Sequence, residues 1–337
     1  MPLFRTTVPI LPSGYALIIA SAALIGLFSI VIALSLGSAD IPLMSVVKSL
    51  YAGEHDLTAR IVLEIRLPRI LSGFYVGAML ALAGCLMQVL LRNPLADPYV
   101  LGVSGGAAVF ALLAILGGMS GLWVNGAAFA GALLSIVLVF VLSHIGGDWN
   151  PLRILLTGVV IAAGWGALIS FLLAISPADR IHGMLFWLMG DLSFVQHTFW
   201  NPVILVLVLF ACVLMARSMN LLAIGELNAA ALGVSVRSLK YFIYFAASVL
   251  TATAVVQGGS IGFVGLVVPH LTRLLFGSDH RLLLPVSALL GGSLLVSADG
   301  LARTIVAPQQ LPVGVLTAMI GVPLFLLLLH IIYRQRT

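Results

Sequence analysis

Charged side chains are scarce in this sequence. Only 8% of its 337 residues are Asp, Glu, Lys or Arg, and lysine occurs only at Lys48 and Lys240. A soluble globular domain carries about 25% charged residues. Hydrophobic residues make up 61% of the chain, and its mean hydropathy is +1.20. So few charges cannot cover a water-exposed surface of this size, and the sequence therefore predicts a protein embedded in lipid. The net charge of +5 forms no basic patch on a polar face, which argues against a nucleic-acid partner.

Cysteine is nearly absent as well. Cys85 and Cys212 both lie inside apolar runs, where a thiol is buried and inert. They exclude a disulfide framework, and no spacing of Cys and His is typical of a metal site. We therefore expect this chain to bind no metal and no cofactor of its own.

The sequence also lacks the groups that would power transport or catalysis. No Gly-x-x-x-x-Gly-Lys-Ser/Thr phosphate loop is present, because neither lysine follows a glycine. No acidic residue lies near the middle of a predicted span, which weakens the case for a proton- or sodium-coupled carrier and for an intramembrane enzyme. If the protein moves a solute uphill, the energy must come from a partner.

Long apolar runs are abundant, and each is close to the roughly 20 residues that a helix needs to cross the hydrocarbon core. The first run is longer than the apolar core of a signal peptide and has no small-residue cleavage site after it, so we expect a retained helix. The eighth run is short and interrupted by Gly and Pro, which is tolerated only where it packs inside protein. We predict an all-α polytopic membrane protein in which residues 1–337 form one transmembrane domain. The ten predicted spans are 15–36, 70–91, 99–117, 122–143, 152–175, 200–216, 239–257, 262–276, 282–299 and 312–333.

The distribution of Lys and Arg predicts the orientation. With the N-terminus inside and the spans alternating, ten of the 16 Lys and Arg residues fall inside. An excess of Lys and Arg is typical of the cytoplasmic side, so we expect both termini in the cytoplasm. The six on the outside are Lys48, Arg60, Arg66, Arg69, Arg180 and Arg303.

The longest polar interruption on the predicted inner side covers residues 218–240, between the sixth and seventh spans. Its centre is alanine-rich and flanked by glycines, which predicts a short helix closed at both ends. This helix either joins two spans as a capped loop or acts as a coupling helix in a groove of a cytoplasmic ATPase, and the residues alone leave both interpretations open. The candidate coupling residues are Gly225, Glu226, Leu227, Asn228, Ala229, Ala230, Leu232 and Gly233.

Several long motifs follow one another through the chain beyond residue 60. They include RLPR over 66–69, RNPLADP over 92–98, WLMG over 187–190, GFxGLxxPHxxR over 262–273 and LPxG over 311–314. In this order they resemble the FecCD family, the permease subunits of type II ABC importers for ferric siderophores, haem and cobalamin. The resemblance implies ten helices per subunit and a second permease copy or a paralogue. It also implies a cytoplasmic ABC ATPase dimer that holds ATP and Mg²⁺, and a periplasmic or lipid-anchored substrate-binding protein.

The resemblance assigns a role to three arginines at the predicted outer mouth. It implies that Arg66, Arg69 and Arg303 receive carboxylates of the binding protein, and a guanidinium suits bidentate carboxylate capture. The alternatives are that they anchor lipid headgroups or pair internally with Glu64 or Asp299.

Five further residues are candidates for the pathway or its gate. The resemblance places an inner gate near His144 and Asp148, whose loop contains a Gly-Gly pair. On the outer side, Met184, Trp187 and Met189 could form a flexible lip over a bulky cargo, or belong to a helix lying in the membrane interface.

Two structural expectations concern the inner side. In the turn over 92–98, we expect Asn93 or Asp97 to cap the following helix, since prolines prevent helix continuation there. We expect His270 to hydrogen-bond backbone that Pro269 frees, in preference to ligating haem iron.

Together these observations predict the permease subunit of an ATP-driven, binding-protein-dependent importer that moves an iron chelate across the cytoplasmic membrane of a bacterium or archaeon. The chain would be no enzyme, because hydrolysis would take place on the ATPase subunits. A cobalamin importer is the closest alternative. A channel or secondary carrier that works alone, and a membrane-embedded enzyme, are the alternatives from other classes.

Overall fold

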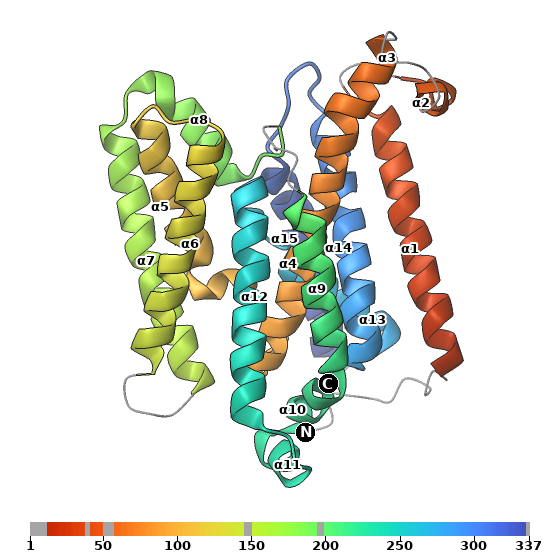
Figure 1. Ribbon diagram of the computed structural model, residues 1–337, viewed down its shortest axis with the longest axis vertical. Helices are drawn as coiled ribbons and strands as arrows, with labels where there is room; N and C mark the ends of the chain where they lie inside the picture. The colour runs from red at the N-terminus through yellow and green to blue at the C-terminus, as the bar shows by residue number, and fades with distance from the viewer. Residues whose placement is uncertain (1–11, 38–40, 50–56, 145–149, 194–198, 335–337) are drawn as a thin grey trace.

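The computed structural model describes residues 12–37, 41–49, 57–144, 150–193 and 199–334 (Figure 1). Within these ranges every regular element is a helix, in agreement with the all-α prediction. The elements are α1 (Pro12–Ser35), α2 (Leu43–Ser49), α3 (Leu57–Arg60), the π-helix η1 (Ile61–Arg66), α4 (Leu67–Leu90), the 3₁₀ helix η2 (Pro98–Leu101), α5 (Val103–Leu116), α6 (Leu122–Ser143), α7 (Pro151–Ile175), α8 (Ala178–Met189), α9 (Trp200–Leu214), α10 (Ala216–Ile224), α11 (Glu226–Ala231), α12 (Val236–Gly258), α13 (Val264–Phe276), α14 (His280–Ala302) and α15 (Val313–Arg334).

Each of the ten predicted spans corresponds to a helix. Six helical segments in the described part of the chain are long and apolar enough to cross a membrane. A seventh candidate is the pair α9 and α10, which is bent by 59° at a short break. Three shorter apolar helices, α5, α13 and α15, occupy the remaining predicted ranges. The prediction of a helix in each of the ten ranges is therefore confirmed.

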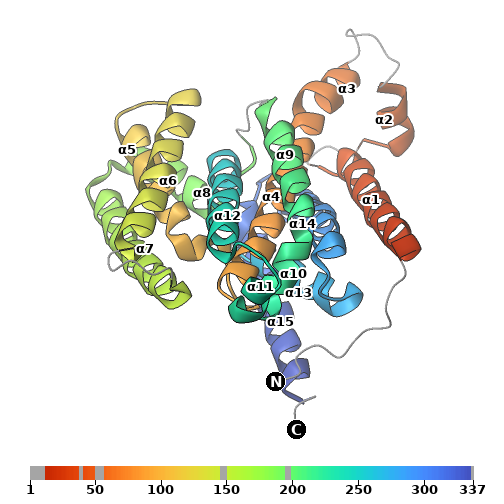
Figure 2. The same ribbon diagram turned by 60° about the horizontal axis from the view of Figure 1, so that its bottom comes forward.

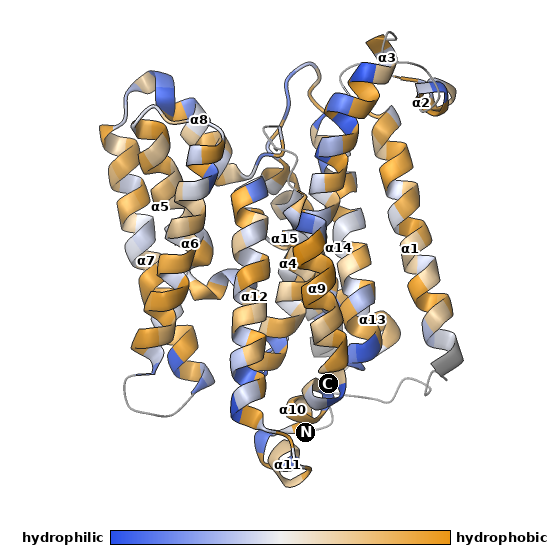
Figure 3. Ribbon diagram, viewed as in Figure 1, coloured by the Kyte–Doolittle hydropathy of each residue, from blue (hydrophilic) through white to orange (hydrophobic). Residues whose placement is uncertain are grey.

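Hydrophobic residues predominate along the middle of the helices, and most hydrophilic residues lie toward the two ends, as expected of a protein solvated by lipid (Figure 3). We call the middle part the apolar band. Helices α2, α3 and α8 lie at one end, and α10 and α11 lie at the other (Figure 1). Helix α1 begins, and α15 ends, on the side that holds α11. We refer to these two sides as the α8 end and the α11 end.

The centre of the molecule is formed by α4, α12 and α14 (Figure 2). Within the chain, 83% of the apolar window in the span that contains α4 is buried, compared with 17% in α7 and 22% in α1. Helices α1 and α7 are therefore peripheral, and their apolar faces are left for lipid or for another protein chain.

Glycines allow the central helices to touch along their backbones. A Cβ atom added to Gly84 on α4 would collide with the backbone of Gly265 on α13, and one added to Gly77 on α4 would collide with the carbonyl oxygen of Gly291 on α14. Such close approach is how small residues let helices pack in lipid, where no hydrophobic effect drives them together.

Two span boundaries differ from the prediction. Helices α3, η1 and α4 follow each other without a break, so the second helical segment covers 34 residues from Leu57 to Leu90 and extends beyond the predicted start at 70. The polar interruption after the sixth span is itself largely helical, since α10 and α11 occupy most of it. Both differences arise because the predicted limits were set where charged residues begin, whereas a helix can extend past the membrane into water with charged residues in its terminal turns.

Candidate functional site

The tip of the α11 end is a short helix closed by glycines, as the sequence predicts. Gly225 precedes α11 with φ of 146°, and Gly233 follows it with φ of 82°. Both angles lie in the region that favours glycine, because a Cβ atom would be strained there. The glycines therefore set this small helix apart from α10 and α12.

The surface of this tip is apolar. Ile224, Leu227 and Leu232 are 70%, 87% and 66% exposed, and Ala230 is also exposed. Ala229, another candidate coupling residue, is fully buried and supports the tip from within. Exposed leucines beyond the apolar band mark a protein contact surface more readily than a solvated loop.

Glu226, the first residue of α11, joins the tip to two other elements. Its carboxylate accepts a hydrogen bond of 2.6 Å from the ammonium of Lys240 on α12, which is almost fully buried. Its other oxygen lies 3.5 Å from the guanidinium of Arg92, at the end of α4. The tip is thus fixed electrostatically to α4 and α12 at the α11 end.

The turn after α4 has the structural role predicted for it. The side chain of Asn93 accepts a hydrogen bond of 3.0 Å from the backbone N–H of Leu95. Asp97 caps η2 by accepting a hydrogen bond of 2.7 Å from the backbone N–H of Tyr99. The predicted Asp97 cap is therefore confirmed.

A polar junction that the sequence did not reveal lies where α10 meets the start of α14. The side-chain N–H₂ of Asn220 donates to Asp279 over 2.9 Å, and its oxygen accepts from the backbone N–H of His280 over 2.9 Å. Nδ1 of His280 lies 2.5 Å from the same oxygen and donates to it when that nitrogen carries the proton. Tyr15 on α1 also donates to Asp279, over 2.9 Å. The junction therefore joins α10, α14 and α1.

Asp279 is the ionised centre of this junction. Burial alone would raise the pKa of Asp279, but hydrogen bonds donated by Arg281, Asn220 and Tyr15 outweigh it and hold the pKa well below its usual range. The signal that could have located this junction is the Ser-Asp pair before α14, which is typical of a helix N-cap.

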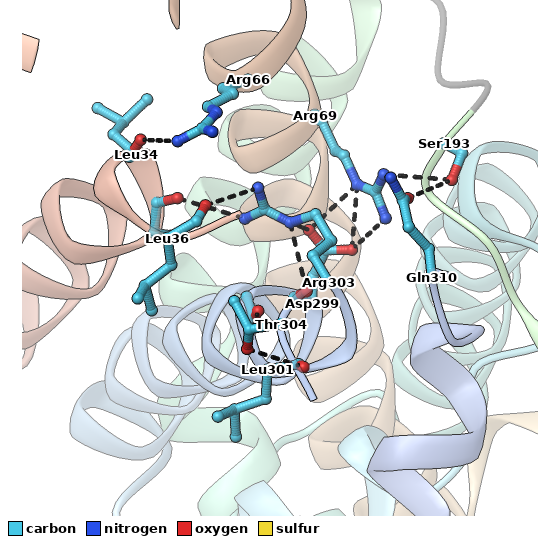
Figure 4. Close-up of polar contacts among 12 residues, drawn as sticks. Leu34, Leu36, Arg66, Arg69, Ser193, Asp299, Leu301, Arg303, Thr304 and Gln310 are labelled. Atoms are coloured by element: carbon cyan, nitrogen blue, oxygen red, sulfur yellow. Dashed lines mark hydrogen bonds and ion pairs between the residues drawn. The ribbon is translucent and has the colours of Figure 1, made fainter. Parts of the chain in front are cut away.

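At the α8 end, one buried carboxylate is shared by two of the predicted docking arginines (Figure 4). Asp299 on α14 is 2% exposed and accepts from both Nε and Nη2 of Arg69, at 3.1 and 2.8 Å. Nε of Arg303 lies 3.0 Å from the other carboxylate oxygen. Nη1 of Arg69 also donates to Ser193 and Gln310, at 3.2 and 2.7 Å. Asp299 therefore pairs with two of these arginines, as one of the alternatives from the sequence proposed. Glu64, the other internal partner considered, lies 3.5 Å from Arg60 instead.

Three arginines at this end donate to backbone carbonyl groups near the ends of helices. Arg66 donates to the carbonyls of Leu34 and Ser35, and Arg303 donates to those of Ala33 and Leu36, all at the end of α1. Arg180 donates to the carbonyls of Ile115 and Leu116 at the end of α5. Cations stabilise helix C-termini, where carbonyl groups lack partners and the dipole is negative. These contacts give a structural role to three of the six Lys and Arg residues that the sequence analysis predicts on the outside. Docking of a binding protein on Arg66, Arg69 and Arg303 stays a prediction.

The candidate gate residues are not gathered at one place. Met184 is fully buried between α5 and α7, so in this arrangement it forms no lip over an opening. Trp187 and Met189, on the same helix, are half-buried. His144 follows the last residue of α6, and its ring stacks on Tyr241 of α12. Its Nδ1 lies 2.6 Å from the Phe140 carbonyl oxygen and donates to it when that nitrogen carries the proton. Asp148 lies outside the described residues.

The expectation for His270 is wrong. Both ring nitrogens are buried without a hydrogen-bond partner within the described residues, and the ring edge meets Phe325 of α15. Helix α13 runs on through Pro269, and the His270 ring packs against an aromatic ring of α15 where it meets no polar partner. No group of three or more His, Cys, Asp or Glu side chains in the described part of the chain could hold a metal ion.

Comparisons with known proteins agree on one family. The sequence profile of the FecCD transport family matches residues 24–331. A cobalamin import system permease protein of Halobacterium salinarum is 45% identical over 280 residues, covering 81% of this chain and 74% of its own length. A hemin transport system permease protein of Yersinia pestis is 41% identical over 329 residues, covering 92% and 95%. A solved structure described as an inward-facing, metal-chelate type ABC transporter has a TM-score of 0.80 at 32% identity, covering 94% of this chain and 99% of its own.

Proposed function

This chain belongs to the FecCD transport family, and from that premise we propose that its cargo is an iron chelate, a ferric siderophore complex or haem. The chain is a transmembrane permease subunit of an ABC importer, and its relatives carry haem, ferric dicitrate or cobalamin according to their descriptions. The observation that supports the metal-chelate class is the structural likeness to a metal-chelate type ABC transporter over almost the whole of both chains. Cobalamin is the second candidate, because a cobalamin import permease is 45% identical to this chain.

We propose that ATP, with Mg²⁺, is bound and hydrolysed by two separate ABC ATPase subunits that meet the α11 end. The exposed apolar side chains of Ile224, Leu227 and Leu232 support this placement. They lie beyond the apolar band, where only another protein can remove them from water. Glu226, held by Lys240 and Arg92, would pass movement of this tip to α12 and α4.

The α11 end then faces the cytoplasm, together with both chain termini, and the membrane is the inner or cytoplasmic one. The opposite end would receive a periplasmic or lipid-anchored binding protein on Arg69, whose guanidinium is the least buried of the predicted docking set. A second copy of the chain, or a paralogue, would complete the pathway along the peripheral faces. The exposed apolar surface of α7 supports this, since lipid or another helix must cover it.

Reconstitution into liposomes tests this function. The chain is purified with a matching ABC ATPase and binding protein, and uptake of labelled ferric siderophore, haem and cobalamin is measured with and without internal ATP. We expect ATP-dependent uptake of one iron chelate, and no uptake by the chain alone. Uptake by the isolated chain without ATP would instead establish a carrier or channel, and ATP-dependent uptake of cobalamin alone would establish the second candidate.

A further inference from the structure

We propose that Asn220 is a positioning residue that joins the coupling segment, residues 218–240, to α14. We further propose that α14 links this segment to the arginine site at the α8 end, which consists of Arg69 and Arg303 around Asp299. The inference rests on the proposed function, since it assumes an ATPase at one end and a binding protein at the other. It adds one defined connection between them, with a polar contact at each end of α14: Asn220 at His280 and Arg69 at Asp299. At about 1.5 Å per residue, these two positions are about 28 Å apart along the helix.

The inner end of this connection is specific because Asn220 uses both halves of its amide. It donates to Asp279, the N-cap residue of α14, and accepts from the first backbone N–H of the helix at His280. A hydrophobic residue could fill the space but could make neither contact. Asn220 lies on α10, five residues before Gly225, and α10 packs against both α11 and α14. Movement of the tip therefore moves the start of α14.

The middle of the connection is stiff. Helix α14 lies against α4 over its length, and the backbones of Gly77 and Gly291 touch with no side chain between them. Closely packed interiors transmit displacement because they cannot absorb it by local repacking. The pair α4 and α14 is therefore expected to shift as one body.

The outer end is again a polar contact with one residue of α14. Asp299 binds Arg69 of α4 and Arg303 in the last turn, and Arg303 also holds the end of α1 (Figure 4). A carboxylate from a docked binding protein would compete with Asp299 for Arg69. Docking would thus change the contacts of α14 at one end, while nucleotide-driven movement of the tip would change them at the other.

Helix α12 offers the obvious alternative route, since Lys240 binds Glu226 directly. Its outer end, however, meets the segment after α8, where the carbonyl of Gly258 accepts from the N–H of Asp191. Helix α4 also reaches both ends, because Arg92 after it lies 3.5 Å from Glu226 and Arg69 lies in its first turn. Among the described residues, however, the hydrogen bonds of Asn220 go to Asp279 and His280 at the start of α14. Variants of Asn220 therefore test the route through α14 separately from the contacts of Glu226 with α4 and α12.

The test uses the whole complex of permease, ATPase and binding protein in nanodiscs. Two quantities are measured: the ratio of ATPase activity with and without binding protein, and the change in the Kd of the binding protein when a nucleotide analogue is added. Linkage applies to the second quantity, because nucleotide and binding protein change each other's affinity by the same factor, typically about 5- to 150-fold. The ATPase ratio is a kinetic readout of the same connection and need not have the same magnitude. For Asn220→Leu we expect the nucleotide-induced change in Kd to disappear and the stimulation ratio to fall toward one. Docking without nucleotide should persist.

Tyr15→Phe is the matched control. It removes a hydrogen bond of similar length to the same carboxylate of Asp279 but leaves both contacts of Asn220 in place. We expect it to retain the full stimulation ratio and the full nucleotide effect on Kd. A merely structural role for the junction would make the two variants behave alike.

The outcomes separate this inference from the proposed function. Wild-type stimulation and an unchanged nucleotide effect in Asn220→Leu would overturn the inference while leaving the importer function intact. Failure of the wild-type chain to assemble with any ATPase would instead overturn the function. If Asn220→Leu does not fold, Asn220→Ser replaces it, because its shorter hydroxyl cannot span both Asp279 and His280. Loss of coupling in a stably assembled Asn220→Ser complex supports the inference, and full coupling overturns it.

Discussion

Lys240, one of two lysines in the chain, is buried beneath the coupling tip and donates a 2.6 Å hydrogen bond to the carboxylate of Glu226. A buried ammonium needs such a partner, because leaving one charge of a buried pair unmatched is strongly destabilising. The contact fixes α11 to α12, and replacement of either Glu226 or Lys240 would remove it.

Replacement of Glu226 should show whether this contact positions the tip. Glu226→Arg places a third cation beside Lys240 and Arg92, so we expect transport to be lost together with about 1–3 kcal/mol of stability. Glu226→Gln keeps a hydrogen-bond acceptor and the shape of the side chain, and it should retain much of the transport. The measurements are ATP-dependent uptake in liposomes and the thermal unfolding midpoint. Wild-type transport by both variants would show that the charge is irrelevant to coupling.

The exposed leucines of the tip should bind the ATPase directly. Leu227→Asp and Leu232→Asp are expected to reduce co-purification of the ATPase at least about tenfold, which corresponds to 1.4 kcal/mol. They should leave the permease itself stable, since both side chains are largely exposed. Leu57→Asp is the matched control, because Leu57 is a 71% exposed leucine on α3, at the opposite end. Retention of the ATPase by both tip variants would place its contact surface elsewhere.

Arg69 should matter for docking more than its exposed neighbour. Arg69→Ala removes the guanidinium that bridges Asp299, Ser193 and Gln310, and we expect binding-protein affinity to fall by about tenfold to a hundredfold. Arg60→Ala is the control, since Arg60 is 59% exposed in a surface pair with Glu64 and such pairs contribute little. Surface plasmon resonance against the permease in nanodiscs measures both. A hundredfold loss for Arg60 and none for Arg69 would reverse this assignment.

The glycine contact between α4 and α13 should tolerate no side chain. In Gly84→Ala the new methyl group meets the backbone of Gly265, so we expect a loss of about 1–3 kcal/mol from overpacking. Gly126→Ala on α6 adds the same methyl where no other atom lies within 4 Å, and it should be neutral or stabilising. Thermal unfolding in detergent compares the two, and similar midpoints would argue against backbone contact at Gly84.

Asp279 should make the protein sensitive to acid. Its pKa is lower in the folded state than in the unfolded state, so the folded state binds fewer protons below neutral pH. The stability that its ionised form contributes is present above the unfolded pKa of about 3.9 and is lost as pH falls below that value. Asp279→Asn should unfold at a lower temperature than wild type at pH 7 but lose less stability between pH 5 and pH 3. Parallel pH profiles for the two proteins would show that this carboxylate is not responsible.

Much of the fold could be predicted from the sequence because membrane spans depend on composition over a short stretch of chain. A run of about 20 apolar residues must form a helix in lipid, since no water is present to satisfy its backbone groups. Local rules also predicted the glycine-closed tip and the Asp97 cap, because glycine angles and N-caps involve only neighbouring residues.

Tertiary structure alone decided which polar groups meet. Asp299 and Arg69 are 230 residues apart, and Asn220 and His280 are 60 apart. The sequence offered Asp299 and Glu64 as alternative partners for the arginines without deciding between them, and it did not pair Asn220 with His280. Helices such as α1 and α5 are apolar all round, so periodicity could not show which face is buried or where a neighbour lies. For the same reason the burial of Met184, and the binding of Arg66 to the carbonyls of α1, appear only once the helices are packed.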